Sequence, residues 1–187
     1  MEQIIRYIQT IYPISDALKT YLSSVLKERT VPKKQFLLRA GHVCRHISFI
    51  TKGMVRCFYI SNSIEISSWF MKEGDFVISV ESFFLQKESR ESIQALENCE
   101  LLSIEYNELE NLYRTFPEFN YIGRVLTERY YILSEQRLYS LRMQAVAARY
   151  KHVMEHYPEL INRVPSKHIA SYLGTTEQNL SRIRSKR

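Results

Sequence analysis

Four polar residues near the end of the sequence have side chains that could read the edges of DNA bases. They are Glu177, Gln178, Ser181 and Arg182. At about 100° per residue along a helix, all four fall on one face, opposite the apolar Leu180 and Ile183. An arginine can donate two hydrogen bonds to guanine O6 and N7, and a glutamine can bond to adenine N6 and N7. The pattern therefore indicates a helix whose outer face enters the major groove of DNA.

A second short helix and a tight turn are expected to position this face. Ala170 is small and allows the two helices to cross closely, and Gly174 can adopt the left-handed conformation that ends a helix. Thr175 or Thr176 can cap the helix that follows. The apolar residues that would hold the two helices together are Ile169, Leu173, Leu180 and Ile183. These are the requirements of a helix-turn-helix.

Polar and cationic residues around the two helices are expected to contact DNA phosphates and so to set the register. They are Lys167, Thr175, Thr176, Asn179 and Arg184. The alternative for both groups of residues is an ordinary pair of surface helices. Because the apolar spacing, the corner glycine, the polar face and the local charge all agree, the sequence favours DNA binding.

The excess positive charge of the chain lies entirely in this C-terminal part. Residues 1–141 carry 17 Lys+Arg and 17 Asp+Glu, whereas residues 142–187 carry nine cations and three acids, which accounts for the formal charge of +6. A basic segment joined to a neutral one suggests a polyanionic partner for the tail alone. A solvated basic surface is the alternative.

The period of the apolar residues changes along the rest of the chain. Up to about residue 26 they recur at helical spacing, with Ser15 as a plausible N-cap. Over roughly residues 30–105 they alternate as in strands, and turn residues separate the runs. Glycines at three of these turns are Gly41, Gly53 and Gly74. Many short strands at this interval indicate an antiparallel roll or barrel.

A long helix is expected after the roll, from Tyr106 or Pro117 through Met143. Its apolar stripe is wide enough for two neighbours, the roll on one side and a second copy of the helix on the other. The residues expected at this dimer seam are Ile122, Val125, Leu126, Ile132, Leu133 and Tyr139. Packing onto the sheet of the same chain is the alternative. The last part is expected to be helical, with breaks at Pro158 and Pro165.

The whole chain resembles the catabolite-activator/FNR (Crp/Fnr) family of bacterial transcription regulators, and KHIASYLGTTEQNLSRI is the most specific part of the resemblance. The resemblance implies an α+β fold, with an antiparallel, cyclic-nucleotide-binding-like β-roll (a double-stranded β-helix or jelly roll) and flanking helices. A long dimerisation helix and a C-terminal winged-helix-type helix-turn-helix with a truncated wing would follow. The expected domains are a sensor at residues 1–116, the dimerisation helix at 117–143 and the DNA-binding domain at 144–187.

The resemblance also implies a function and partners. In that family a glutamate, a serine or glycine and an arginine read the operator, and the matching residues here are Gln178, Ser181 and Arg182. The protein would be a homodimeric cytoplasmic regulator that binds a near-palindromic site in double-stranded DNA, with RNA polymerase as a further partner. The alternative is a ligand-binding module whose helical tail docks a protein instead of DNA. Steep weakening of binding with salt would distinguish DNA from an apolar docking partner.

The roll carries a partial match to the family's nucleotide site. The segment VESFFLQKESRESIQAL supplies Glu81 and Arg90 at the positions of the ribose-binding glutamate and the phosphate-binding arginine, with Ser92 close by. Val80 replaces the usual glycine, and Glu91 adds a carboxylate that would repel a phosphate. Cyclic AMP, another effector in the roll and no effector at all therefore remain open, and no other cofactor is implied.

The remaining reactive residues do not form a catalytic or metal site by their spacing. His152 and His156 lie four apart on an expected helix and could share a metal ion, but no third ligand adjoins them, so we expect them to be solvated. The three cysteines are far apart and resemble small reduced core residues; they are Cys44, Cys57 and Cys99. No apolar run approaches the length of a membrane span. We expect neither a metal site nor enzymatic activity.

Overall fold

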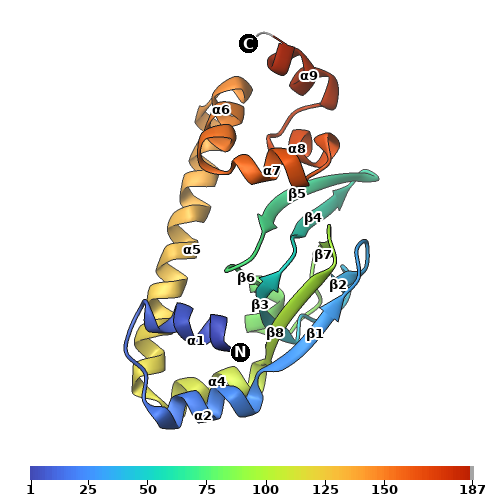
Figure 1. The fold of residues 1–187 in the computed structure, drawn as a ribbon. Helices are drawn as coiled ribbons and strands as arrows, with labels where there is room; N and C mark the ends of the chain where they lie inside the picture. Colours follow the sequence, from blue (N-terminus) through green and yellow to red (C-terminus); the bar gives the residue numbers. More distant parts are fainter. Residues whose placement is uncertain (186–187) are drawn as a thin grey trace.

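A computed structural model of the chain describes residues 1–185. Two of the tail cations counted above, Lys186 and Arg187, lie outside the described residues. Figure 1 shows a β-roll with helices at one end, a long helix running along its side, and a group of short helices at the far end. The predicted α+β class with an antiparallel roll is confirmed.

Two helices precede the roll, α1 (Glu2–Gln9) and α2 (Asp16–Val25). The predicted cap of α2 is confirmed, because the Ser15 hydroxyl accepts a hydrogen bond from the Leu18 N–H at 3.2 Å. The cap gives an orphan donor of the first helical turn a partner. Both helices turn their apolar residues toward the roll, and Ile4, Ile8, Leu18 and Leu22 are buried there.

The roll consists of two four-stranded antiparallel sheets with strand orders β1-β8-β3-β6 and β2-β7-β4-β5. The strands are β1 (Lys27–Val31), β2 (Phe36–Leu38), β3 (His46–Lys52), β4 (Val55–Ser61), β5 (Ile64–Met71), β6 (Phe76–Val77), β7 (Glu91–Ala95) and β8 (Cys99–Glu105). One short helix, α3 (Val80–Leu85), interrupts the strand sequence between β6 and β7. The β4–β5 hairpin closes through Asn62 and Ser63, which both have positive φ, as a two-residue turn with the right twist demands.

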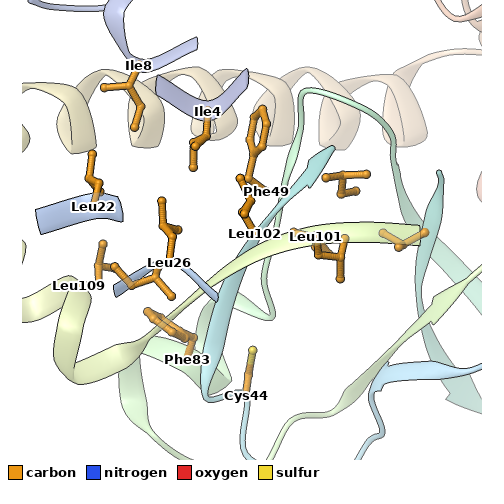
Figure 2. Close-up of a cluster of buried hydrophobic side chains, with 14 of the residues drawn as sticks. Ile4, Ile8, Leu22, Leu26, Cys44, Phe49, Phe83, Leu101, Leu102 and Leu109 are labelled. Atoms are coloured by element: carbon orange, nitrogen blue, oxygen red, sulfur yellow. The ribbon is translucent and has the colours of Figure 1, made fainter. Parts of the chain in front are cut away.

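The main core lies between the sheets and the helices at one end of the roll. Figure 2 shows side chains from α1, α2 and the helix after β8 converging on Phe49 and Leu102 of the sheet. Close to this core, Tyr7, Phe49 and Phe76 contact one another, with ring centroids 5.2–5.8 Å apart. The helices that flank the strands in the sequence therefore close the open end of the roll.

The helix expected from Tyr106 or Pro117 is in fact two helices, α4 (Tyr106–Thr115) and α5 (Pro117–Met143). Pro117 begins the second one, since proline is tolerated where a helical N–H has no partner in any case. A Cβ on Gly123 would lie 2.5 Å from the ring of Tyr113, so this glycine allows α4 and α5 to pack closely within one chain.

The start of α5 packs on the roll, and this corrects one predicted seam residue. Ile122 is 0% exposed and belongs to the main core, so its side chain has no surface left for a second copy of the helix. Leu126 also packs against this core, though only partly buried. One turn further on, the Tyr130 hydroxyl accepts a hydrogen bond from the Phe76 N–H at 2.8 Å. The apolar residues in the first half of α5 thus pack against the roll of the same chain.

Four short helices complete the described chain, α6 (Val146–His156), α7 (Pro158–Arg163), α8 (Ser166–Tyr172) and α9 (Glu177–Ser185). The predicted breaks at Pro158 and Pro165 are confirmed. These helices form a second core with Met54 and Leu96 of the roll. In Figure 1, α8 lies over β5, whereas α9 stands at the end of the molecule away from the strands. Within the described residues, no helix combines the length and apolarity needed to cross a bilayer.

Candidate nucleic-acid interface and effector cavity

The turn between α8 and α9 has the geometry of a helix-turn-helix corner. Gly174 has φ +66°, in the left-handed region that glycine adopts without steric cost. The Gly174 N–H donates to the Ser171 carbonyl and the Thr175 N–H to the Ala170 carbonyl, both at 3.0 Å. This pair of bonds is the Schellman arrangement, and it satisfies carbonyls that the end of α8 leaves free. The predicted role of Gly174 is therefore confirmed.

Thr176, one of the two predicted candidates, caps α9. Its hydroxyl accepts a hydrogen bond from the Asn179 N–H at 3.2 Å. The Thr175 hydroxyl accepts instead from the side-chain amide of Asn179 at 2.8 Å. Three of the residues expected at phosphates thus also stabilise the first turn of α9.

The four residues expected to read bases all lie on the solvent-exposed side of α9: Glu177, Gln178, Ser181 and Arg182. On the opposite side, Leu180 is 1% exposed, and Ile183 packs against the same second core. The orientation of the helix follows from this burial, because turning the polar face inward would expose Leu180 to water.

The residues expected at phosphates differ in how free their side chains are. Lys167 is exposed at the start of α8. Arg184 is held inside the motif, because it donates to the Ser166 hydroxyl at 2.7 Å and its guanidinium lies 5.6 Å from the centre of the Tyr150 ring. Arg184 therefore stabilises the motif itself, and its contact with a DNA phosphate stays a prediction.

Arg149 of α6 joins the long helix to the helix-turn-helix. It is 9% exposed, and its guanidinium donates to the carbonyls of Leu141 and Gln144 at the end of α5 and of Leu173 at the end of α8. The carbonyl ends of helices carry partial negative charge, so one buried cation stabilises both. Arg149 belongs to the basic segment but is not available to a polyanion.

Helix α8 is anchored on the β4–β5 hairpin. The Ser171 hydroxyl donates to the Glu65 carbonyl and accepts from the Ser67 N–H, both at 2.9 Å. Tyr172 lies beside Phe70 of β5, with ring centroids 5.2 Å apart, and under the guanidinium of Arg137 of α5 at 3.5 Å. The roll, the long helix and the helix-turn-helix therefore meet at one point.

A buried arginine of the roll lies beneath α8. Arg56 of β4 is 1% exposed, bonds to the Glu65 carboxylate at 2.6 Å and stacks on Phe58 at 4.0 Å. It also donates to Nδ1 of His168, which is 9% exposed. Burial, followed by the positive charge of Arg56, lowers the pKa of His168 to about 4. His168 is therefore neutral at pH 7, and protonation of its Nδ1 would break the hydrogen bond from Arg56.

Arg163 of α7 makes the second anchor. It forms four hydrogen bonds at 2.6–2.9 Å with the carboxylates of Glu73 and Glu97, which come from two turns of the roll. These bonds lower the pKa of Glu73 to about 2 and also lower the pKa of Glu97. Arg163, like Arg149 a cation of the basic C-terminal segment, is thus neutralised by two acidic residues of the electrically neutral segment 1–141.

Sequence reasoning missed these anchors, and the reason is physical. Alternation along β4 places Arg56 on the outer face of a strand, where an arginine is ordinarily solvated. Only the docking of α8 buries it. No local spacing relates Arg163 to Glu73 and Glu97, which are 90 and 66 residues away.

The residues expected at a nucleotide do not form a phosphate cradle. Arg90 bonds to the Glu81 carboxylate at 2.8 Å, Lys87 lies 2.7 Å from the same carboxylate, and the Arg90 side chain is 75% exposed. The Ser92 hydroxyl accepts from the Ala40 N–H at 3.0 Å, and the described residues that line the cavity below do not include it. The placement of Ser92 in the effector pocket is therefore corrected.

A cavity of about 560 Å³ lies between the roll and α5, and we call it the α5 cavity. Its lining is mainly apolar and comes from both sheets, from the helices α1 to α4 and from α5 as far as Ser134; it includes Cys57, Trp69, Met71, Phe76, Ile78, Phe84, Leu126 and Tyr130. Glu91 is the half-buried acidic group of its wall, and burial raises the pKa of this carboxyl, opposed in part by hydrogen bonding with Ser79 and Tyr59. Glu81 and Arg90 lie at its edge.

The histidine pair, the cysteines and the remaining seam residues can also be located in the structure. The imidazoles of His152 and His156 stack on each other at 4.2 Å, and no group of three potential metal ligands occurs within residues 1–185. All three cysteines are free and buried. Of the remaining seam residues, Ile132 is 54% and Tyr139 61% exposed, whereas Val125 and Leu133 are half-buried.

Comparison with known proteins agrees with this architecture. Residues 28–116 match the cyclic nucleotide-binding domain. No curated protein matches the chain. The structure is similar to a c-di-GMP responsive global regulator, CLP, of Xanthomonas campestris, at 18% identity, with 92% of this chain and 91% of that chain covered and a TM-score of 0.73.

Two further solved structures have the same arrangement. A CooA mutant from Carboxydothermus hydrogenoformans is 19% identical, with 92% and 78% of the two chains covered and a TM-score of 0.68. A putative transcriptional regulator of the Crp/Fnr family from Eubacterium rectale is 16% identical, with 92% and 83% covered and a TM-score of 0.69. Residues 28–116 are therefore a cyclic nucleotide-binding-type domain, within a chain that has the fold of the Crp/Fnr regulators.

Proposed function

We propose that the protein is a sequence-specific DNA-binding transcription regulator that acts as a homodimer, and not an enzyme. The observation that carries the proposal is the polarity of α9. Its polar residues are exposed, while Leu180 on the opposite side anchors it in the second core. A helix of this kind, which follows a tight glycine corner, is the reading element of a helix-turn-helix.

The chemistry of the exposed face suggests specific contacts. Arg182 is the candidate for a bidentate contact to guanine, and Gln178 for a contact to adenine. Glu177 and Ser181 would complete the reading face. Lys167, with the hydroxyls of Thr175 and Thr176, would contact the backbone, where such contacts fix orientation. Asn179 would support these contacts by holding Thr175 in place.

The proposed dimer would use the outer face of α5. Large apolar side chains that recur at helical spacing stay exposed along it, although the inner face is covered by the roll: Ile132, Tyr139 and Met143. A row of this kind is unusual on a monomer surface. Two copies paired there would present two α9 helices to successive major grooves, about 34 Å apart, on a near-palindromic site. RNA polymerase would be the further partner, and the cytoplasm the compartment.

Selection of bound duplexes from a random pool tests the proposal. We expect an enriched motif with two related half-sites separated by about one helical turn. A pool that shows no enrichment above its starting composition would contradict sequence-specific binding.

The alternative function is a module whose helical tail docks a protein. It makes a different prediction for salt. The affinity for DNA falls steeply as salt rises, because bound counterions are released from the duplex. Enriched duplexes that bind equally well across a several-fold rise in salt would favour apolar docking instead.

A further inference from the structure

The α5 cavity is large and mainly apolar, and its walls belong to two different parts of the protein. At about 560 Å³ it falls within the range of small-molecule sites, roughly 300–1,000 Å³. Trp69, Met71 and Phe76 come from the roll, and Leu126 and Tyr130 come from α5. Protein interiors pack densely, and a void much larger than a water molecule is costly when it is empty.

The composition of the wall decides the kind of molecule that suits this space. A mainly apolar wall gives water few hydrogen-bond partners, so an apolar molecule that displaces water from this space is favoured. A cyclic nucleotide would need a cation for its phosphate. The Arg90 guanidinium is already paired with Glu81 and mostly exposed, and the carboxylate of Glu91 would repel a phosphate.

Glu91 provides a hydrogen-bonding group in the wall of the cavity, which can orient a ligand. It lies on β7 opposite Tyr59 of β4, and it is half-buried in a wall that is otherwise mainly apolar. A carboxylate accepts hydrogen bonds, so a ligand group that donates an N–H or O–H would match it. One polar contact that fixes orientation within an apolar pocket is the usual design of a small-molecule site.

We propose that the α5 cavity binds an uncharged, mainly apolar small molecule that donates one hydrogen bond to Glu91. The inference rests on the proposed function in one respect, that this molecule is the effector of the regulator. Such a molecule would touch the roll and α5 together. Because the end of α5 is joined through Arg149 to α6 and α8, its presence can bias the helix-turn-helix.

Binding can be measured with N-phenyl-1-naphthylamine, an uncharged apolar fluorophore with one N–H donor. Trp69 is the only tryptophan of the chain and lines the cavity, so energy transfer from it reports on the cavity itself. We expect saturable transfer with one site per chain and a dissociation constant on the order of 1–10 µM. Cyclic AMP should not displace the probe, even at a large excess.

Substitutions in the cavity sharpen the test. Thr127→Phe adds a ring at the exposed mouth on α5, where folding tolerates it, and should weaken probe binding at least ~10-fold by occupying the space. Ile78→Phe repeats the test from the sheet side. Glu91→Gln should weaken binding about 5-fold, because the amide offers one acceptor oxygen in place of the two oxygens of the carboxyl group. Glu100→Gln removes an exposed carboxylate of β8 outside the cavity lining and should change nothing.

Several outcomes would overturn the inference. They are the absence of energy transfer, transfer that both phenylalanine variants leave unchanged, and displacement of the probe by cyclic AMP. Binding confined to concentrations at which the chain is monomeric would also overturn it, because the partner's α5 would then be the occupant. The enriched duplexes separate this inference from the proposed function. Probe binding without sequence-specific DNA binding would sink the function alone, and the reverse result would sink the inference alone.

Discussion

Helix α9 and the α3–β7 segment of the roll both contain residue types that could bind a nucleic acid or nucleotide, yet within residues 1–185 only α9 leaves them unpaired among themselves at the surface. In α9 the reading residues are exposed and Leu180 holds the helix from behind. In the α3–β7 segment Glu81 and Arg90 neutralise each other at the surface. The exposed face of a helix is determined by which of its residues are apolar and buried, so the sequence of that one helix is enough to define it. A phosphate site instead needs several cationic or N–H groups from different segments to converge without pairing with one another.

The same contrast applies to the charges of the tail. Lys167 and Arg182 are exposed, but Arg149 and Arg163 are bound to carbonyls and carboxylates within the protein. The positive charge of a segment is therefore larger than the charge it can offer to a polyanion. The acids that neutralise Arg163 come from the roll, so the charge also joins the two regions.

The largest expected effect comes from the anchor of α9. Leu180→Ala would leave a cavity in the second core and should lower the free energy of unfolding of the helix-turn-helix by about 2–5 kcal/mol. Urea unfolding followed by circular dichroism measures it. Ser181→Ala, on the exposed side of the same helix, is the control and should leave stability unchanged. Equal losses in both variants would mean that α9 does not turn Leu180 inward.

The anchor at Arg163 should come next. Arg163→Gln leaves two carboxylates without their cation, and we expect a loss of about 2–3 kcal/mol in the free energy of unfolding. Arg124→Gln removes an exposed arginine paired four residues away on α5, and it should cost far less. If the two variants have equal stability, the roll and the tail are not joined through Arg163.

Acidification should loosen the contact between α8 and the roll. The pKa of His168 lies near 4 in the folded protein and near 6.5 when unfolded, so protonation favours the unfolded chain as pH falls from about 6.5 toward 4. From this shift, with Arg56, Glu65 and Lys167 as its charged neighbours, we expect a loss of about 2 kcal/mol at pH 5.

The difference in unfolding free energy between pH 7 and pH 5 measures this loss. His168→Gln should remove that part of the pH dependence, because glutamine does not titrate. His152→Gln changes an exposed imidazole and should retain it. Identical pH profiles for wild type and His168→Gln would contradict the buried position of His168.

The smallest effect is expected at the degenerate nucleotide site. Arg90→Gln breaks an exposed ion pair, and we expect no measurable change in stability or in cyclic AMP binding. Isothermal calorimetry with cyclic AMP makes the check. Tight binding by the wild type that is lost in this variant would remove the contrast between α9 and the roll.

Much of the fold could be predicted from the sequence, because the type and spacing of neighbouring residues determine many of its helices, strands and turns. The glycine corner at Gly174, the cap at Ser15 and the alternation of the strands each depend on a few neighbouring residues. The exposed side of α9 follows from the spacing of Leu180 and Ile183. These features require no knowledge of distant parts of the chain.

The rest depends on packing between distant segments. Ile122 was expected at a dimer seam, but the roll covers it. Arg184 contacts Ser166 and Tyr150, which lie 18 and 34 residues away along the chain. The α5 cavity likewise forms only where the roll and α5 meet, so no single stretch of sequence reveals its size or polarity.

The variant Arg182→Ala, measured on a duplex obtained by selection, shows whether α9 reads DNA sequence. We predict that its preference for that duplex over a scrambled one falls about 10–100-fold, through the loss of one bidentate base contact. Lys151→Ala removes an equal charge from an exposed position on α6 and should leave the preference intact. A preference that survives Arg182→Ala unchanged, in a folded protein, would mean that this face of α9 does not read the bases.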